Sequence, residues 1–125
     1  MKLLVTGAWN CTEEQLKAVE NLGHEIFFMQ NEKDALPIPH ETVEGVIGNG
    51  IFLHHDIKTF ENLKYIQLTS AGFDRVPLDY ISEKNIKIFN ARGVYSIPMA
   101  EFALCGVLQL YKKSRFFFDN QNSFA

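Results

Sequence analysis

A turn of small residues, Ser70-Ala71-Gly72, follows an apolar segment that has the composition of a buried strand. Open α/β sheets bind ligands beyond the carboxyl ends of their strands. Small residues let backbone amides approach an anion, and a carboxylate held by two amides gains charge-assisted hydrogen bonds. The turn therefore predicts a cradle for a small organic acid. An ordinary βα turn, which also favours Ser and Gly, is the alternative.

A second turn, Gly48-Asn49-Gly50, follows the preceding strand and should lie at the same edge of the sheet. We interpret Asn49 and Gly50 as a second wall of the pocket, in contact with the hydroxyl or the tail of the bound acid. A turn with Asn and Gly in left-handed conformations is the alternative. A dinucleotide-binding fingerprint is excluded here because Leu53 stands where its third glycine is required, and no other segment supplies one.

The tripeptide His54-His55-Asp56 contains residues that bind metals, but adjacent histidines point in different directions. No further His, Cys or Glu completes a ligand set, so we predict surface residues and no metal site. His24 and His40 are isolated in the sequence and are expected to be structural or exposed. Asp74 is interpreted as a residue that holds the turn or Arg75 rather than as a catalytic group.

The elements that would position these turns alternate between strand and helix. Thr12 and Gln15 have the spacing of a capping box at a helix start, and Gly23 is suited to end that helix. A short helix is predicted from Val76 to Glu83. The predicted strands are Lys2–Thr6, His24–Met29, Gly45–Gly48, Leu63–Leu68 and Ile86–Phe89. This pattern predicts an α/β fold of the flavodoxin-like type: a five-stranded parallel sheet with helices on both faces.

A longer helix is predicted from Ile97 to about Phe118, because no Gly-Pro pair interrupts it and Pro98 falls in its first turn. It is apolar on nearly all sides, which predicts burial on all sides. At about 22 residues it would reach about 33 Å, more than the width of a small sheet. We therefore divide the chain into residues 1–96, a flavodoxin-like domain, and residues 97–125, a crossover helix with a tail.

Composition excludes several classes of protein. The 125 residues are 46% hydrophobic, the net charge is -3 and the isoelectric point is about 5.8, which does not favour binding to nucleic acid or to an anionic membrane. Cys11 and Cys105 are too few for a disulfide framework and are expected to be reduced thiols. The apolar amino terminus is too short for a signal peptide, and no apolar run would span a bilayer. A cytoplasmic location is the expectation.

Three segments resemble a known family. Ser70 to Asp74 reads Ser-Ala-Gly-Phe-Asp, Asn90 to Val94 reads Asn-x-x-Gly-Val, and Ala100-Glu101 stands near the start of a helix. The chain is similar in these segments to the substrate-binding domain of the D-isomer-specific 2-hydroxyacid dehydrogenases, the family of phosphoglycerate dehydrogenase. The resemblance implies the same sheet layout. It also implies that the amides of Ala71 and Gly72 grip the substrate carboxylate, and that Ile97 faces the nicotinamide end of the cofactor.

The resemblance implies hydride transfer between NAD(H) and a 2-hydroxy or 2-keto acid. The family's catalytic arginine, histidine and glutamate belong to a nucleotide domain or to sequence beyond it, so no catalytic residue is assigned. Because the resemblance covers about the first third of a family member, a fragment or a truncated gene product is expected. Such a chain should be inactive alone, with NAD or NADP bound only in the intact protein. A homodimer through Pro98 to Phe118 is also expected.

A stand-alone flavodoxin-like binding or signalling module is the alternative function. A phospho-acceptor receiver domain needs acidic residues after its first strand and an Asp after its third. Gly7-Ala8-Trp9 and Gly48-Asn49-Gly50 stand at those positions. A flavin site needs a phosphate loop rich in Ser and Thr, and the segment from Gly7 to Thr12 is a poor version of one.

Overall fold

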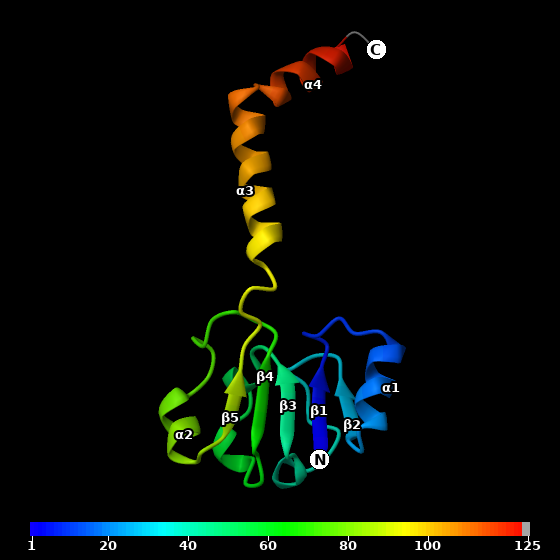
Figure 1. Ribbon diagram of the computed structural model, residues 1–125, viewed down its shortest axis with the longest axis vertical. Coiled ribbons are helices and arrows are strands. Elements are labelled where there is room, and N and C mark those ends of the chain that lie inside the picture. The colour runs from blue at the N-terminus through cyan, green and yellow to red at the C-terminus, as the bar shows by residue number, and fades with distance from the viewer. Residues whose placement is uncertain (124–125) are drawn as a thin grey trace. The chain divides into compact units, whose positions relative to one another are not determined.

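The first part of the chain forms a sheet of five parallel strands. The structure, a computed structural model, describes residues 1–123. The strand order is β2-β1-β3-β4-β5 (Figure 1). This order and the all-parallel pairing confirm the predicted flavodoxin-like sheet. The strands are β1 (Lys2–Thr6), β2 (Glu25–Met29), β3 (Gly45–Gly48), β4 (Tyr65–Leu68) and β5 (Lys87–Phe89).

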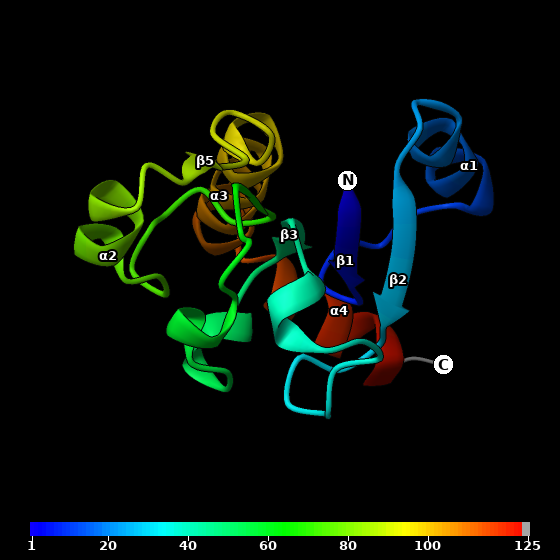
Figure 2. The same cartoon turned by 90° about the horizontal axis from the view of Figure 1, so that it is seen from below.

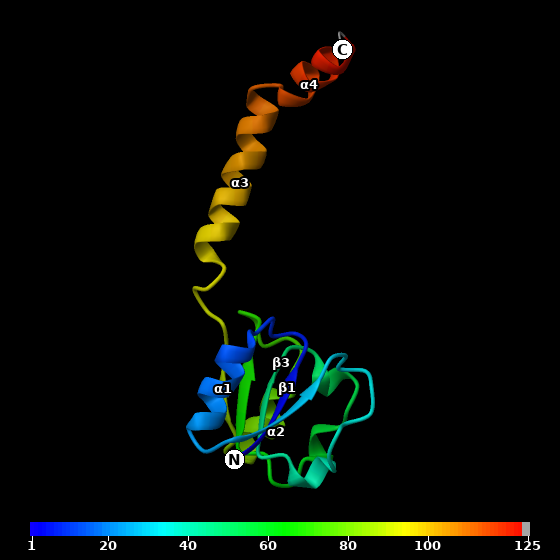
Figure 3. The ribbon, with the colours of Figure 1, turned by 90° about the vertical axis from the view of Figure 1, so that its right-hand side faces the viewer.

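Helical elements lie on both sides of this sheet, as predicted. Figures 2 and 3 show α1 (Glu13–Asn21) on one side and the short turns between β3 and β4 on the other. Two of these turns are 3₁₀ helices, Ile51–Leu53 and Ile57–Thr59, and a third 3₁₀ turn, His40–Thr42, precedes β3. The helix α2 (Leu78–Glu83) connects β4 to β5.

The two ends of α1 follow the predicted signals. The Thr12 hydroxyl accepts a hydrogen bond from the Gln15 amide at 3.3 Å, and the Gln15 side chain accepts one from the Thr12 amide at 2.9 Å. This reciprocal pair is the predicted capping box. The helix is followed by Gly23, whose φ of 92° lies in the left-handed region that glycine adopts without steric cost.

The core lies on the side of the sheet that faces the 3₁₀ turns and α2. One row of side chains crosses all five strands in register. Its three central members are fully buried and pack with Ile51 of the second 3₁₀ turn and Ile81 of α2. The row consists of Phe27, Leu4, Val46, Ile66 and Ile88. Burial of this row fixes the register of the strands, because a slip of one residue would turn every member to the other face.

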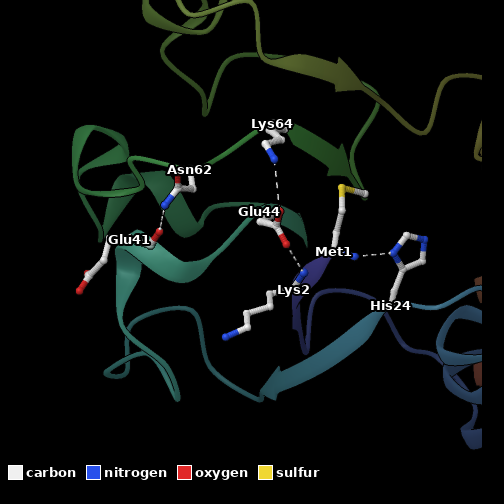
Figure 4. A network of polar contacts seen from close by, with 7 residues as sticks. All are labelled: Met1, Lys2, His24, Glu41, Glu44, Asn62 and Lys64. Atoms are coloured by element: carbon white, nitrogen blue, oxygen red, sulfur yellow. Dashed lines mark hydrogen bonds and ion pairs between the residues drawn. The ribbon is translucent and has the colours of Figure 1, made fainter.

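Polar contacts hold together the edge of the sheet at which the strands begin (Figure 4). The Glu44 carboxylate accepts a hydrogen bond from the Lys2 amide at 2.8 Å and pairs with the Lys64 ammonium at 3.3 Å. The Lys2 hydrogen bond, and after it the Lys64 contacts, lower the pKa of Glu44 below its ordinary value of 4.5. Glu44 thus links the start of β1 to the residue that precedes β4.

The predicted single helix from Ile97 to about Phe118 is wrong. The structure has α3 (Ser96–Tyr111) and a separate α4 (Ser114–Ser123). Lys113 separates them with a φ of 53°, a left-handed conformation that interrupts the helical hydrogen bonds. Gly and Pro are the residues that ordinarily mark a helix end in the sequence, and Lys113 is neither. A polar run from Lys112 to Arg115 coincides with the break. These residues offer little apolar surface whose burial would favour a continuous helix.

The side chains of α3 are also not buried, contrary to the expectation for an apolar helix. No residue of α3 is buried, and both Phe102 and Leu110 are 83% exposed. Within residues 1–123, no helix is long and apolar enough to cross a membrane.

The chain divides into two compact units, Met1–Arg92 and Gly93–Ala125. The division lies between Arg92 and Gly93, whereas the sequence placed it between residues 96 and 97. The last two residues of the predicted tail, 124 and 125, lie outside the described residues.

Candidate functional site

The turn after β4 has two backbone amides without a hydrogen-bond acceptor. Within residues 1–123, neither the Ala71 nor the Gly72 amide donates a hydrogen bond, and both residues are exposed. The carbonyl groups of the same turn are engaged. Asn90 donates from Nδ2 to the Ala71 carbonyl at 2.7 Å, and the Ser70 hydroxyl donates to the Gly72 carbonyl at 3.1 Å. The turn is thus held through its acceptors while its donors stay accessible.

Asn90 anchors this turn to the end of β5. Its Oδ1 accepts a hydrogen bond from the Arg92 amide at 3.3 Å, and the Ala91 amide donates to the Ser70 carbonyl at 2.9 Å. Asn90 thus fixes its loop through hydrogen bonds to the backbone on both sides.

Gly72 lies close to the side chain of Asp74. A Cβ atom on residue 72 would lie 2.9 Å from Asp74 Oδ1, closer than carbon and oxygen tolerate without movement. The Asp74 carboxylate therefore stands beside the turn. Its negative charge opposes an anion at the Gly72 amide, so a bound acid needs a cation from elsewhere to gain appreciable affinity.

The turn after β3 has a different arrangement, because its amides already hold a carboxylate. Glu32 accepts hydrogen bonds from the Asn49 amide at Oε1 and from the Gly50 amide at Oε2, both at 2.7 Å. Oε1 also accepts one from the Thr6 hydroxyl at 2.8 Å. Glu32 thereby joins the loop after β2, the last residue of β1 and the loop after β3. Any contact of Asn49 or Gly50 with a substrate has to use atoms other than these two amides.

The glycine at position 48 leaves room for this carboxylate. A Cβ there would lie 2.7 Å from Glu32 Oε1 and 3.0 Å from the Thr6 hydroxyl oxygen. Beside it, the Asn49 side-chain oxygen is buried and has no hydrogen-bond partner within the described residues. An unpaired buried acceptor is costly. The hydrogen bond that holds Asn49 in place comes from its backbone amide, which donates to Glu32.

Two histidines, His40 and His55, hold the backbone of Glu32 in place. His55 Nε2 lies 3.0 Å from the Glu32 carbonyl oxygen, and His55 Nδ1 lies 3.3 Å from His40 Nε2. Because a carbonyl only accepts, His55 donates from Nε2 and accepts from His40 at Nδ1. His40 is half-buried and paired, which fits the expectation of a structural residue, whereas His55 is half-buried rather than an ordinary surface residue. His54 is exposed, as expected.

The described residues do not build a metal site or a dinucleotide site. No group of three or more His, Cys, Asp or Glu in residues 1–123 is arranged to hold a metal ion. The Gly48–Gly50 loop does not fit a dinucleotide pyrophosphate, because Glu32 occupies its amides and Leu53 replaces the third glycine. No cofactor step is therefore derived from these residues.

The predicted substrate residues come together, whereas the predicted cofactor residue lies in the other unit. β3 and β4 are adjacent, with Gly48 in register with Leu68, so the two turns are neighbours at the carboxyl edge of the sheet. Ile97 lies on α3 and is 70% exposed. Both cysteines are free thiols, Cys105 exposed and Cys11 half-buried.

A comparison with protein families decides the relationship. Residues 11–123 match the profile described as "D-isomer specific 2-hydroxyacid dehydrogenase, catalytic domain". The chain belongs to this family. The resemblance predicted from Ser70–Asp74 and Asn90–Val94 is thus confirmed. No match was found among curated proteins.

Several solved structures share the fold of this chain. An NAD-dependent formate dehydrogenase from Staphylococcus aureus, solved with NAD, has a TM-score of 0.71 and 21% identity, covering 92% of this chain and 40% of that one. The TT0316 protein from Thermus thermophilus has a TM-score of 0.67 and 20% identity, covering 95% and 40%. Phosphoglycerate dehydrogenase from Lactobacillus plantarum has a TM-score of 0.55 and 22% identity, covering 96% and 38%. The chain thus spans about two fifths of the length of these structures.

Proposed function

We propose that this chain is the substrate-binding part of an NAD-dependent D-2-hydroxyacid dehydrogenase, and that the amides of Ala71 and Gly72 bind the carboxylate of a 2-hydroxy or 2-keto acid. The single observation that carries the proposal is that both amides are exposed and unpaired at the carboxyl edge of the sheet. Family membership supports the reaction class. Asn49 and Gly50 form the neighbouring wall.

Two amides beside the Asp74 carboxylate bind an acid only weakly. Hydride transfer also requires positioned acid-base and electrostatic groups, and none of Arg75, Arg92 and Arg115 matches the arginine that the family uses. We therefore expect the 125-residue chain to bind small acids but to oxidise no NADH in their presence. In the intact protein, NAD or NADP binds to a nucleotide domain that follows residues 97–125. Ile97 contacts the nicotinamide end of this cofactor.

The apolar second unit is proposed as a dimer interface. Large exposed side chains extend along both of its helices, including Ile97, Met99, Phe102, Leu104, Val107, Leu108, Leu110, Tyr111, Phe116, Phe117 and Phe118. A contiguous exposed apolar surface of this kind marks an interaction site. We assign this apolar surface to the pairing of two copies of the chain through Pro98 to Phe118. We also propose a cytoplasmic location for the assembled enzyme.

The carboxylate cradle is tested by following backbone amide resonances during titration with pyruvate. Ala71 and Gly72 should shift in a saturable way, with a dissociation constant on the order of 10 mM, which corresponds to about 2.7 kcal/mol. Pyruvamide, which keeps the size but lacks the negative charge, is the matched control and should shift neither amide. Saturable pyruvate binding elsewhere, with Ala71 and Gly72 unmoved, would contradict the proposal.

A further inference from the structure

Glu32 makes a set of contacts that the proposed function leaves unused. Its carboxylate accepts three hydrogen bonds of 2.8 Å or less, two of them from backbone amides at the carboxyl edge of the sheet. Two adjacent amides that share one carboxylate are the arrangement proposed for the substrate acid at Ala71 and Gly72. Of these two turns, one thus has an amide pair that holds a carboxylate and the other has a pair that does not.

The two amide pairs are close neighbours in the fold. β3 and β4 are hydrogen-bonded along their length, and beyond the strands the Thr69 amide donates to the Gly48 carbonyl at 2.9 Å. A small acid that reaches this edge of the sheet therefore meets both turns. Without Glu32 it would find two pairs of donors, and the Asp74 carboxylate beside Gly72 would favour the pair at Asn49 and Gly50.

We propose that Glu32 is a specificity-determining positioning residue, which occupies the Asn49 and Gly50 amides with its own carboxylate and so confines the acid group of the substrate to Ala71 and Gly72. This inference rests on the proposed function. Its consequence is orientation: the acid end of the substrate lies at the turn after β4, and the remainder lies toward Asn49 and Gly50. The two turns together then bind one ligand carboxylate instead of two.

The surroundings of Glu32 favour a permanent occupant over a mobile one. Thr6, which is fully buried, holds Oε1, and the Glu32 carbonyl is fixed by His55. Arg75 is the cation whose side chain approaches this turn, with its Cδ 4.0 Å from the position of a Cβ on Gly50. Within residues 1–123, Arg75 forms no ion pair with Glu32, so the amides and the hydroxyl retain the carboxylate.

The test is chemical rescue of Glu32→Ala by acetate, followed through backbone amide resonances and thermal unfolding. In the wild-type chain, acetate should shift Ala71 and Gly72 but not Asn49 or Gly50. In Glu32→Ala it should shift both pairs, with half-saturation on the order of 100 mM for so small a ligand. The thermal midpoint of Glu32→Ala should fall by about 10 °C and should recover in part with acetate but not with chloride.

Glu20→Ala removes the same charge from the exposed surface of α1 and should behave as the wild type in both measurements. Glu32→Ser also removes the carboxylate and opens the space for acetate, and it provides the same readout if Glu32→Ala is unfolded without acetate. Glu32 variants whose Asn49 and Gly50 amides ignore acetate would overturn the inference, and so would saturable shifts of these amides in the wild type. If acetate shifts Asn49 and Gly50 in the variant but shifts Ala71 and Gly72 in neither protein, the result would instead contradict the proposed cradle.

Discussion

Glu32 Oε2 accepts a hydrogen bond from the Gly50 amide at 2.7 Å, across a sequence separation of 18 residues. This contact joins the loop after β2 to the loop after β3, which are not adjacent in the sheet because β1 lies between their strands. Thr6, at the end of β1, completes the connection through Oε1. The carboxyl ends of three strands are therefore held by one side chain, and the turn after β4 lies beside them with free donors.

Gly48→Ala should disturb the contacts of Glu32 by crowding its carboxylate. The new methyl group would lie 2.7 Å from Glu32 Oε1, so the carboxylate has to move or lose its bond to Thr6. Crowding of this kind costs about 1–3 kcal/mol, which chemical denaturation measures directly. Gly106→Ala is the control, because within residues 1–123 its added Cβ meets nothing within 4 Å apart from its own helix backbone and chain neighbours, and alanine favours the helix. Equal stability of Gly48→Ala and the wild type would show that the Glu32 contacts are not rigid.

His55→Ala should loosen Glu32 without touching its carboxylate. The variant loses the hydrogen bond to the Glu32 carbonyl and the contact with His40, at a cost of about 1–2 kcal/mol in unfolding free energy. His54→Ala, its exposed neighbour, should change stability by less than about 0.5 kcal/mol. Thermal unfolding of the two variants under identical conditions makes the comparison. A larger effect at His54 would contradict the arrangement of the pair.

Asn90→Ala should mobilise the proposed cradle. Loss of the 2.7 Å hydrogen bond to the Ala71 carbonyl should cost about 1 kcal/mol because the site is exposed. Faster amide hydrogen exchange is expected at Ala71 and Gly72, together with weaker pyruvate binding. Asn90→Asp keeps the acceptor for the Arg92 amide but loses the donor, and should reproduce the same loss. Unchanged exchange in both variants would show that the turn is held by other contacts.

Stability should depend on pH through Glu44 at the amino-terminal edge of the sheet. Because the Lys2 amide and then Lys64 lower its pKa in the folded state, Glu44 contributes fully above its ordinary pKa of 4.5. The contribution is lost as the pH falls through the lowered folded-state value. Glu44→Gln should therefore unfold at a lower temperature than the wild type at neutral pH, and the difference should close under acidic conditions. Glu20→Gln, which changes an exposed carboxyl of α1 in the same way, is the control for the substitution itself.

Phe102→Glu and Leu110→Glu should separate the proposed dimer. Both side chains are 83% exposed, so a charge there does not disturb the fold of a single chain but opposes burial between two chains. Analytical ultracentrifugation should give a dimer for the wild type and a monomer for each variant. Gln109→Glu introduces the same charge at another position of α3 and locates the interface. A wild-type monomer at micromolar concentration would refute pairing through this unit.

Much of the fold follows from local patterns in the sequence. The apolar runs at β1, β3 and β4 predict buried parallel strands, and Thr12, Gln15 and Gly23 mark the ends of α1 through contacts within a few residues. The site was predicted in part for the same reason, since Ser70-Ala71-Gly72 is one continuous segment. The helix break at Lys113 was missed, because its left-handed backbone occurs in a residue type that rarely adopts it.

By itself, the sequence determined the alternation of strands and helices as far as β5, the position of the two turns and membership of the dehydrogenase family, because each depends on short continuous segments of the chain. Only the tertiary structure decided which turn has free amides. Glu32 and Gly50, like His40 and His55, meet through the packing of separate loops, and no local pattern encodes that meeting. A hydrogen bond selects its partner by distance and direction in space, and the fold alone supplies both.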